Sequence, residues 1–112
     1  MTHEMRLTHR PFEKIRAGTK TIEMRLYDEK RAGLRVGDTI VFTDTDSGAR
    51  MECLVLALHR SAAFAELYAR HDKGSLGYDA DQPARPEDML AYYPPEEIEK
   101  YGVVGIEVKR MD

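Results

Sequence analysis

The sequence predicts a single α+β domain in which a small, mostly antiparallel barrel or curled sheet is decorated by helices. The chain has 112 residues, which suffices for one hydrophobic core and places all of residues 1–112 in one domain. Its central strand-like segments are joined by connections of hairpin length, as in antiparallel sheets. No long alternation of strands and helices is present, which argues against a doubly wound parallel fold.

The first half of the chain is expected to form a strand, a helix and three further strands. Pro11 suits the first turn of the helix, and Gly18 ends it because glycine adopts the left-handed cap conformation without penalty. Alternation of apolar and polar residues predicts the strands, and the turn-forming tract T-D-T-D-S-G predicts a hairpin between the last two. The strand at residues 49–58 is expected to be buried on both faces in its second half. The strands span residues 4–8, 21–27, 39–42 and 49–58, and residues 28–33 form a charged turn or a single helical turn.

The second half is expected to contain three short helices and a closing strand. Ser61 can cap the first helix, and a proline in the first turn begins each of the other two. Residues 72–85 are the longest irregular stretch and could fold over a pocket. The helices are expected at residues 62–70, from Pro86 to the Pro94–Pro95 break and from Pro95 to Tyr101, and the strand at 103–108.

Charge is distributed unevenly along the chain. The net charge of −3 argues against a protein that coats nucleic acid indiscriminately. Residues 1–37 contain nine Lys or Arg against five Asp or Glu, so the remainder of the chain is strongly acidic. This asymmetry permits a local anion-binding patch on an acidic body, although charges also cluster by chance in so short a chain.

Several classes of protein are not indicated by the sequence. No apolar run approaches the roughly 18 residues of a membrane span, and the first residues lack the pattern of a secretion signal, so a cytoplasmic protein without a membrane partner is expected. The one cysteine, Cys53, is expected to be buried apolar filler. The four histidines lack metal-binding spacing and no phosphate-binding glycine loop is present, so neither a metal nor a cofactor is expected.

The candidate site is a group of charged residues just after Gly18. Glu23 and Arg25 lie two residues apart on one face of the expected strand, where they can pair or face a ligand. Lys20 has the parity of the core residues, so it joins this face only if the strand starts irregularly. A lysine beside a carboxylate can act as a base or nucleophile, and a carboxylate beside arginine stays ionised. The structural alternative is a solvated, charged strand face. The candidate neighbours are Arg6, His9 and Tyr27.

The aromatic residues divide into two groups. Tyr27 and Tyr78 are candidates for stacking on a nucleic-acid base. The other tyrosines occupy helix positions that indicate the edge of the core, namely Tyr68, Tyr92, Tyr93 and Tyr101.

The string G-x-K-x-x-E-x-R at residues 18–25, followed by Gly37-Asp38 and by the closing segment Y-G-V-V-G-I-E-V, resembles the ASCH (activating-signal-cointegrator homology) domain family. The resemblance implies a PUA-like β-barrel with a cleft beside the motif strand. In that cleft Lys20, Glu23 and Arg25 would bind RNA or a nucleotide-like ligand. Replacement of Lys20 or Arg25 by alanine is then expected to weaken binding with little loss of stability.

The resemblance also implies an enzymatic alternative. Some very small ASCH proteins are amidohydrolases that deacylate acetylcytidine with a Lys, a Thr and a Glu. Lys20 matches their lysine, Glu23 stands where they have threonine, and Asp72 or Glu87 are weak candidates for their glutamate. Lys20 and Glu23 would then be the catalytic residues. Ribonuclease activity is less favoured because no general acid–base pair can be assigned, and a third alternative is a structural domain whose charged face binds nothing. The sequence does not indicate an oligomeric state.

Overall fold

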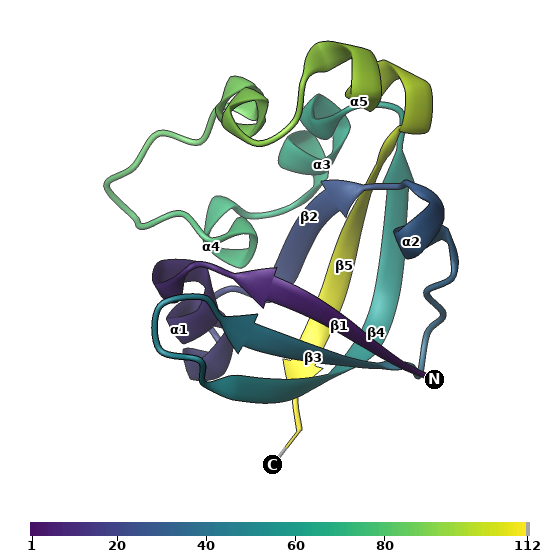
Figure 1. Cartoon of the computed structure of the whole chain (residues 1–112). Coiled ribbons are helices and arrows are strands. Elements are labelled where there is room, and N and C mark those ends of the chain that lie inside the picture. The colour runs from purple at the N-terminus through teal and green to yellow at the C-terminus, as the bar shows by residue number, and fades with distance from the viewer. Residues whose placement is uncertain (112) are drawn as a thin grey trace.

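The computed structural model describes residues 1–111 as a curled, five-stranded sheet surrounded by short helices (Figure 1). The strand order is β1-β3-β4-β5-β2, with β1 parallel to β3 and the other three pairs antiparallel. The prediction of an α+β fold with a mostly antiparallel sheet is therefore confirmed. The strands are β1 (Thr2–Leu7), β2 (Ile22–Leu26), β3 (Thr39–Asp44), β4 (Arg50–Ser61) and β5 (Val103–Arg110).

The sheet is a half-barrel, so of the two predicted forms the curled sheet is confirmed, and the β-barrel that the family resemblance implied is not closed. Strands β1 and β2 are its two edges, and within residues 1–111 they do not pair with each other. Helix α1 (His9–Ala17) connects these edges, and a side chain of β2 reaches across, where the guanidinium of Arg25 donates to the carbonyl oxygen of Arg6 at 2.8 Å. We call this open edge-to-edge region the seam of the half-barrel.

The remaining helices are short and follow the expected order with three differences. Helix α3 begins at Phe64 rather than after Ser61, because Ser61 still belongs to β4 and pairs with Val103. A short helix, α4, lies within the stretch expected to be irregular, and the helix after Pro86 is a 3₁₀ helix. Among residues 1–111, no helix has both the length and the apolar composition needed to cross a membrane. The helices are α2 (Glu29–Ala32), α3 (Phe64–Arg70), α4 (Lys73–Leu76), η1 (Pro86–Ala91) and α5 (Pro95–Tyr101).

Two apolar clusters form the core on either side of the sheet. In one, Phe12 and Ile15 of α1 pack against β1, β3, β4 and β5, as the spacing of these two residues predicted. In the other, β2 packs against α3, α4 and η1, which lie toward the upper and left parts of Figure 1. The residues of β2 that enter this second cluster are Ile22, Met24 and Leu26.

Strand β4 differs from the prediction in its second half. Cys53 is fully buried, as expected, but Leu56 is 41% exposed, so the strand is not buried on both faces. The cause is a shift of register between Val55 and Ala57, which leaves Leu56 outside the regular pairing with β5.

Two histidines meet where β4 passes the end of α3. The rings of His59 and His71 make an edge-to-face contact with centroids 4.6 Å apart, and His59 Nε2 lies 2.9 Å from a carboxylate oxygen of Glu107. In the described part of the chain, the buried Nε2 atom of His71 has no hydrogen-bond partner. Burial lowers the pKa of His71, and the neighbouring His59 lowers it further. The folded protein therefore favours neutral His71.

We expect His71 to lower the free energy of unfolding as the pH drops below 6.5, the ordinary pKa of histidine. The unfolded chain then binds a proton that folded His71 accepts only at lower pH. The variant His71→Gln removes this difference, so its stability should depend less on pH, by at most about 1.4 kcal/mol per pH unit. Urea unfolding between about pH 7.5 and pH 5.5 measures the effect.

His9→Gln is a control of opposite sign. A hydrogen bond with Asp44 raises the pKa of His9, so this histidine stabilises the fold below pH 6.5 and loses that effect as the pH rises through its folded pKa. The stability of His9→Gln should therefore depend more steeply on acid than that of the wild type. Parallel pH curves for the wild type and His71→Gln would contradict our account of His71.

Candidate ligand-binding cleft

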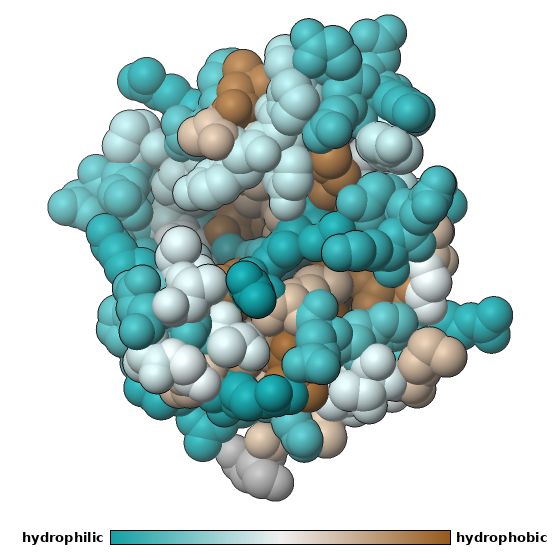
Figure 2. Space-filling view, in the orientation of Figure 1, coloured by the Kyte–Doolittle hydropathy of each residue, from teal (hydrophilic) through white to brown (hydrophobic). Residues whose placement is uncertain are grey.

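A cleft of about 500 Å³ lies at the seam of the half-barrel. One wall comes from the end of β1, the start of α1 and strand β2, and the other from α3, α4, η1 and the segments around them. Figure 2 shows this face hollowed, with hydrophobic residues visible at the floor and hydrophilic ones around the rim. The polar residues that line the cleft are Arg6, Thr8, Arg10, Lys14, Lys20, Glu23, Arg25, Tyr68, Tyr78, Gln82, Asp88, Tyr92 and Tyr93.

Lys20, Glu23 and Arg25 form a buried ionic cluster in this cleft. Lys20 Nζ lies 2.9 Å from Glu23 Oε1, and Arg25 Nε donates to Glu23 Oε2 at 2.6 Å. Glu23 is 6% exposed and Lys20 is 8% exposed, so the alternative of a solvated charged face does not hold. Burial raises the pKa of Glu23, but the charges and hydrogen bonds of Lys20 and Arg25 outweigh it and leave the pKa below its ordinary value. Glu23 is therefore an ionised carboxylate at neutral pH.

The end of α1 explains why Lys20 reaches Glu23. Gly18 ends the helix with φ of 85°, and the carbonyl oxygen of Lys14 accepts hydrogen bonds from the backbone N–H groups of Thr19 and Lys20. The chain is thus held against the end of the helix, and regular strand pairing begins only at Ile22. The strand does start irregularly, which brings Lys20 to the side of Glu23.

Arg25 joins the cluster to the seam. Its guanidinium donates to Glu23 and to the carbonyl oxygen of Arg6, which lies in the opposite edge strand. Burial lowers the pKa of Arg25, but the Glu23 charge more than compensates and raises it. The expectation that alanine at Lys20 or Arg25 costs little stability does not fit this arrangement. Removing either cation weakens the buried ion pairing of Glu23. The loss of stability should be smaller than the about 3–5 kcal/mol of breaking an isolated buried ion pair, because one cation still pairs with Glu23.

Four tyrosines line the cleft, and three of them were expected only at the edge of the core. The hydroxyl groups of Tyr68 and Tyr78 lie 2.7 Å apart, and Tyr78 donates to Asp88 Oδ2 at 2.7 Å. Since an ionised carboxylate only accepts, the Tyr78 proton is directed at Asp88 and Tyr68 donates to Tyr78. Tyr93 stacks on Phe64, and Tyr92 is 72% exposed. The local signal for this wall was the pair Tyr92-Tyr93 directly before Pro94-Pro95.

Burial keeps the hydroxyl groups of Tyr68, Tyr78 and Tyr93 protonated. It raises the pKa of Tyr68 and of Tyr93, and in Tyr78 it acts together with the hydrogen bonds to Tyr68 and Asp88. The wall therefore offers aromatic surface and neutral hydroxyl groups, whereas the opposite wall carries ionised groups.

Of the six predicted ligand-binding residues, the structure brings four together at the cleft, namely Lys20, Glu23, Arg25 and Arg6. It places the other two elsewhere. Tyr27 follows the end of β2, packs against the core and lies under the guanidinium of Arg60, with 3.8 Å to the ring centroid. His9 Nδ1 bonds to Asp44 Oδ2 at 2.7 Å, at the turn between β3 and β4.

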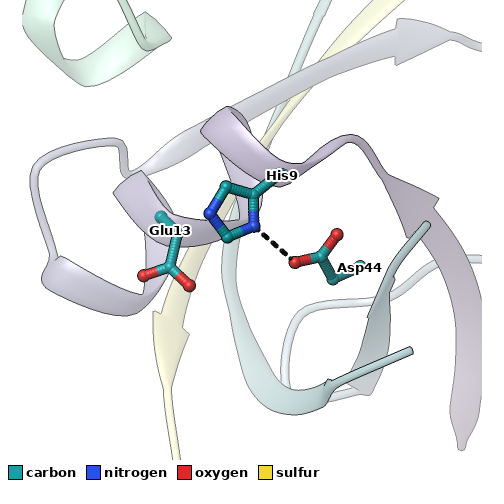
Figure 3. Close-up of side chains that lie close together, drawn as sticks. All are labelled: His9, Glu13 and Asp44. Carbon is teal, nitrogen blue, oxygen red and sulfur yellow. Dashed lines mark hydrogen bonds and ion pairs between the residues drawn. The ribbon is translucent and has the colours of Figure 1, made fainter. Parts of the chain in front are cut away.

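His9, Glu13 and Asp44 are a group whose potential metal-ligating atoms lie within 4.8 Å of one another (Figure 3). Histidine spacing alone could not reveal this group, because Asp44 comes from a distant strand. Asp44 also accepts hydrogen bonds from the backbone of Asp46 and the hydroxyl of Ser47. The bond from His9 is the main cause that lowers the pKa of Asp44 to about 2. These bonds order the turn, so the closeness of the three residues already has a structural explanation.

Gly77 packs directly against Lys20. Its φ is 106°, and a Cβ atom at this position would lie 3.0 Å from Lys20 Cδ and 3.3 Å from Lys20 Nζ. In addition, the backbone N–H of Thr21 donates to the carbonyl oxygen of Ser75 at 3.0 Å. The region from α4 to Gly77 therefore borders the ionic cluster, in the part of the chain that was expected to fold over a pocket.

The comparisons with known proteins concern nearly the whole chain. The family model described as the ASCH domain matches residues 5–111. A crystal structure of the hypothetical protein PH0355 is 31% identical, with a TM-score of 0.84, and the match covers 99% of this chain and 100% of that chain. A solution NMR structure of protein PF0455 from Pyrococcus furiosus is 30% identical, with a TM-score of 0.78 and coverage of 100% and 99%. No curated protein matches the chain.

We expect Gly77→Ala to lower the free energy of unfolding by about 2 kcal/mol or more, because it combines backbone strain with a displacement of Lys20. Gly37→Ala is the matched control, since Gly37 has φ of 94° but faces open space. That variant should lose only about 1 kcal/mol from backbone strain. Urea unfolding of both variants measures the difference, and equal losses would mean that Lys20 does not pack against Gly77.

Proposed function

The chain belongs to the ASCH domain family, and on that premise we propose that its cleft binds a nucleotide-like ligand, either free or as part of single-stranded RNA. The observation that carries this proposal is the pairing of a buried ionic cluster with a wall of tyrosines across one cleft. The ionic cluster supplies charged donors and an acceptor, and the tyrosines supply aromatic surface. A nucleotide offers polar groups that can pair with the ionic cluster and a base that can stack on the tyrosines.

The polar groups of the cluster suit the edge of a base. Glu23 is ionised, so it can accept hydrogen bonds from base amino groups at lone pairs that its cations leave over. Lys20 and Arg25 together have more N–H groups than their described bonds to Glu23 and Arg6 use. These remaining donors can bond to base or phosphate oxygens, and Arg6 adds positive charge at the same wall.

The size of the cleft supports a ligand of the size of one nucleotide. Its volume of about 500 Å³ lies in the ordinary range for small-ligand sites. Gly77 and Tyr78 border the cleft on the side facing Lys20. A bound RNA strand would therefore place one nucleotide in the cleft and leave the neighbouring nucleotides outside. The basic residues around it favour an anionic ligand and predict that binding weakens as salt is added.

We expect Tyr92→Ala to weaken binding of a short single-stranded RNA by about 5- to 150-fold, because one stacking contact with a base contributes about 1–3 kcal/mol. Tyr92 is 72% exposed, so the fold should be unaffected. Leu90→Ala is the control, since Leu90 is 49% exposed in η1 and is not among the residues that line the cleft. Fluorescence anisotropy with labelled RNA measures the affinities. Equal affinity of Tyr92→Ala and the wild type would argue against the tyrosine wall as a binding surface.

The alternative function is hydrolysis of an acylated nucleoside. The packing of Gly77 against Lys20 supports this alternative, because an enzyme needs a segment such as the one around Gly77 close to its reacting groups to exclude water. Ionised Glu23 could accept a proton from water, while the Lys20 ammonium group could stabilise a developing oxyanion. The candidates for a second carboxylate are not supported. Asp72 caps α4 by accepting from Gly74, Glu87 is exposed, and neither lines the cleft.

Under the binding proposal, we expect no release of cytidine and acetate when the protein is incubated with acetylcytidine. The matched variant is Lys20→Met, which keeps most of the apolar stem of the side chain and leaves Glu23 paired with Arg25. Chromatography of the reaction mixture detects the products, and circular dichroism checks that the variant is folded. Turnover by the wild type that disappears in folded Lys20→Met would establish the enzymatic alternative instead.

A further inference from the structure

Two basic residues on α1 hold an acidic residue from the segment beyond α4. Lys14 Nζ donates to Asp79 Oδ1 and to the carbonyl oxygen of Gly77, each at 2.7 Å. Arg10 bonds to the other oxygen, Asp79 Oδ2. Arg10 and Lys14 lie one helical turn apart, and both line the cleft. Both oxygens of one carboxylate are therefore bound between two cations at the cleft wall.

This arrangement is the one that two oxygens of a phosphate group would adopt. A phosphate carries more negative charge and more acceptor oxygens than a carboxylate, so the same two cations would bind it more strongly. Hydrogen bonds and charge from Lys14 and Arg10 lower the pKa of Asp79, so its carboxyl group is ionised and acts as an anion here.

We propose that Arg10 and Lys14 form a subsite for the phosphate group of the ligand, and that Asp79 occupies this subsite in the free protein. The inference deepens the proposed function and rests on it, because it assigns the phosphate and the base of a nucleotide to different parts of the same cleft. Asp79 is then an internal competitor that the phosphate displaces.

The exposure of the three side chains makes the exchange feasible. Asp79 is 41% exposed and Arg10 is 68% exposed, and ion pairs with such access to water contribute little to stability. Lys14 is more buried, at 20% exposed, and it keeps its bond to the carbonyl oxygen of Gly77 when Asp79 leaves. The subsite therefore remains formed without its internal anion.

Gly77 places this subsite next to the ionic cluster. Lys14 Nζ bonds to the carbonyl oxygen of Gly77, while the position of a Cβ atom on the same residue lies 3.3 Å from Lys20 Nζ. The two ammonium groups thus lie against a single residue. A ligand whose base reaches Glu23 would have its phosphate within reach of Lys14.

The experiment compares the wild type with Asp79→Asn and with Asp81→Asn, a matched control that removes the same charge from an exposed residue of the same segment. The probes are the four ribonucleosides, their 5′-monophosphates and inorganic phosphate, titrated by NMR at low and high salt. We expect Asp79→Asn to bind at least one monophosphate about two- to tenfold more tightly than the wild type, with unchanged affinity for the matching nucleoside. Asp81→Asn should bind monophosphates like the wild type, and Lys14→Gln should lose the preference for monophosphate over nucleoside.

The outcomes separate this inference from the proposed function. Nucleoside binding without any preference for the monophosphate, and without an effect of Asp79→Asn, would overturn the phosphate subsite and leave the proposed function in place. Shifts caused by inorganic phosphate at Arg10 and Lys14, with no binding of nucleosides and with monophosphates bound no more tightly than inorganic phosphate, would support the subsite and overturn the proposed function. Equal effects of Asp79→Asn and Asp81→Asn would mean that the change in affinity comes from the overall charge of the protein, and would contradict the role of Asp79 as a competitor of the phosphate.

Discussion

The negative charge of Glu23 lies inside the protein, and two cations make this possible. An unpaired buried carboxylate would cost several kcal/mol, whereas Lys20 and Arg25 each bind one of its oxygens. Each cation is also held by a different part of the fold. Lys20 is positioned by the end of α1 and by Gly77, and Arg25 is bound to the carbonyl oxygen of Arg6 in β1. One carboxylate thereby connects both edges of the sheet, a helix and the segment after α4, and the cleft lies where they meet.

The cleft occurs at the seam because the sheet does not close. Edge strands carry backbone groups that no neighbouring strand satisfies, and proteins usually cover or cap them. Here Arg25 satisfies one such carbonyl with its side chain, which leaves space beside it that a further strand would have filled. The tyrosines and Asp88 complete the opposite wall. The polar character of the cleft therefore follows from the architecture of a half-barrel.

The local sequence pattern predicted those features that depend only on residues close together in the chain. The alternation in β2 placed Glu23 and Arg25 on one face, and Gly18 marked the end of α1. Whether Lys20 joins that face depends on hydrogen bonds to the carbonyl oxygen of Lys14, which strand periodicity does not encode. The sequence left a barrel and a curled sheet as alternatives because closure depends on pairing between distant edge strands. The tyrosine wall and the contact of Asp79 with α1 likewise join residues far apart in the chain, and the pair Tyr92-Tyr93 was a local signal for only part of that wall.

The position of β2 in the sheet has a consequence for how the protein is made. This strand pairs with β5, where Ile22 lies opposite Glu107, so its partner is synthesised only after β3, β4 and the helices between β4 and β5. Until then the nascent chain has the charged motif but no neighbouring strand to order it. Such long-range pairing also makes folding slow relative to proteins with local contacts. A ribosome-bound chain that lacks β5 thus has Lys20, Glu23 and Arg25 already synthesised, but the strand that carries Glu23 and Arg25 is not yet paired.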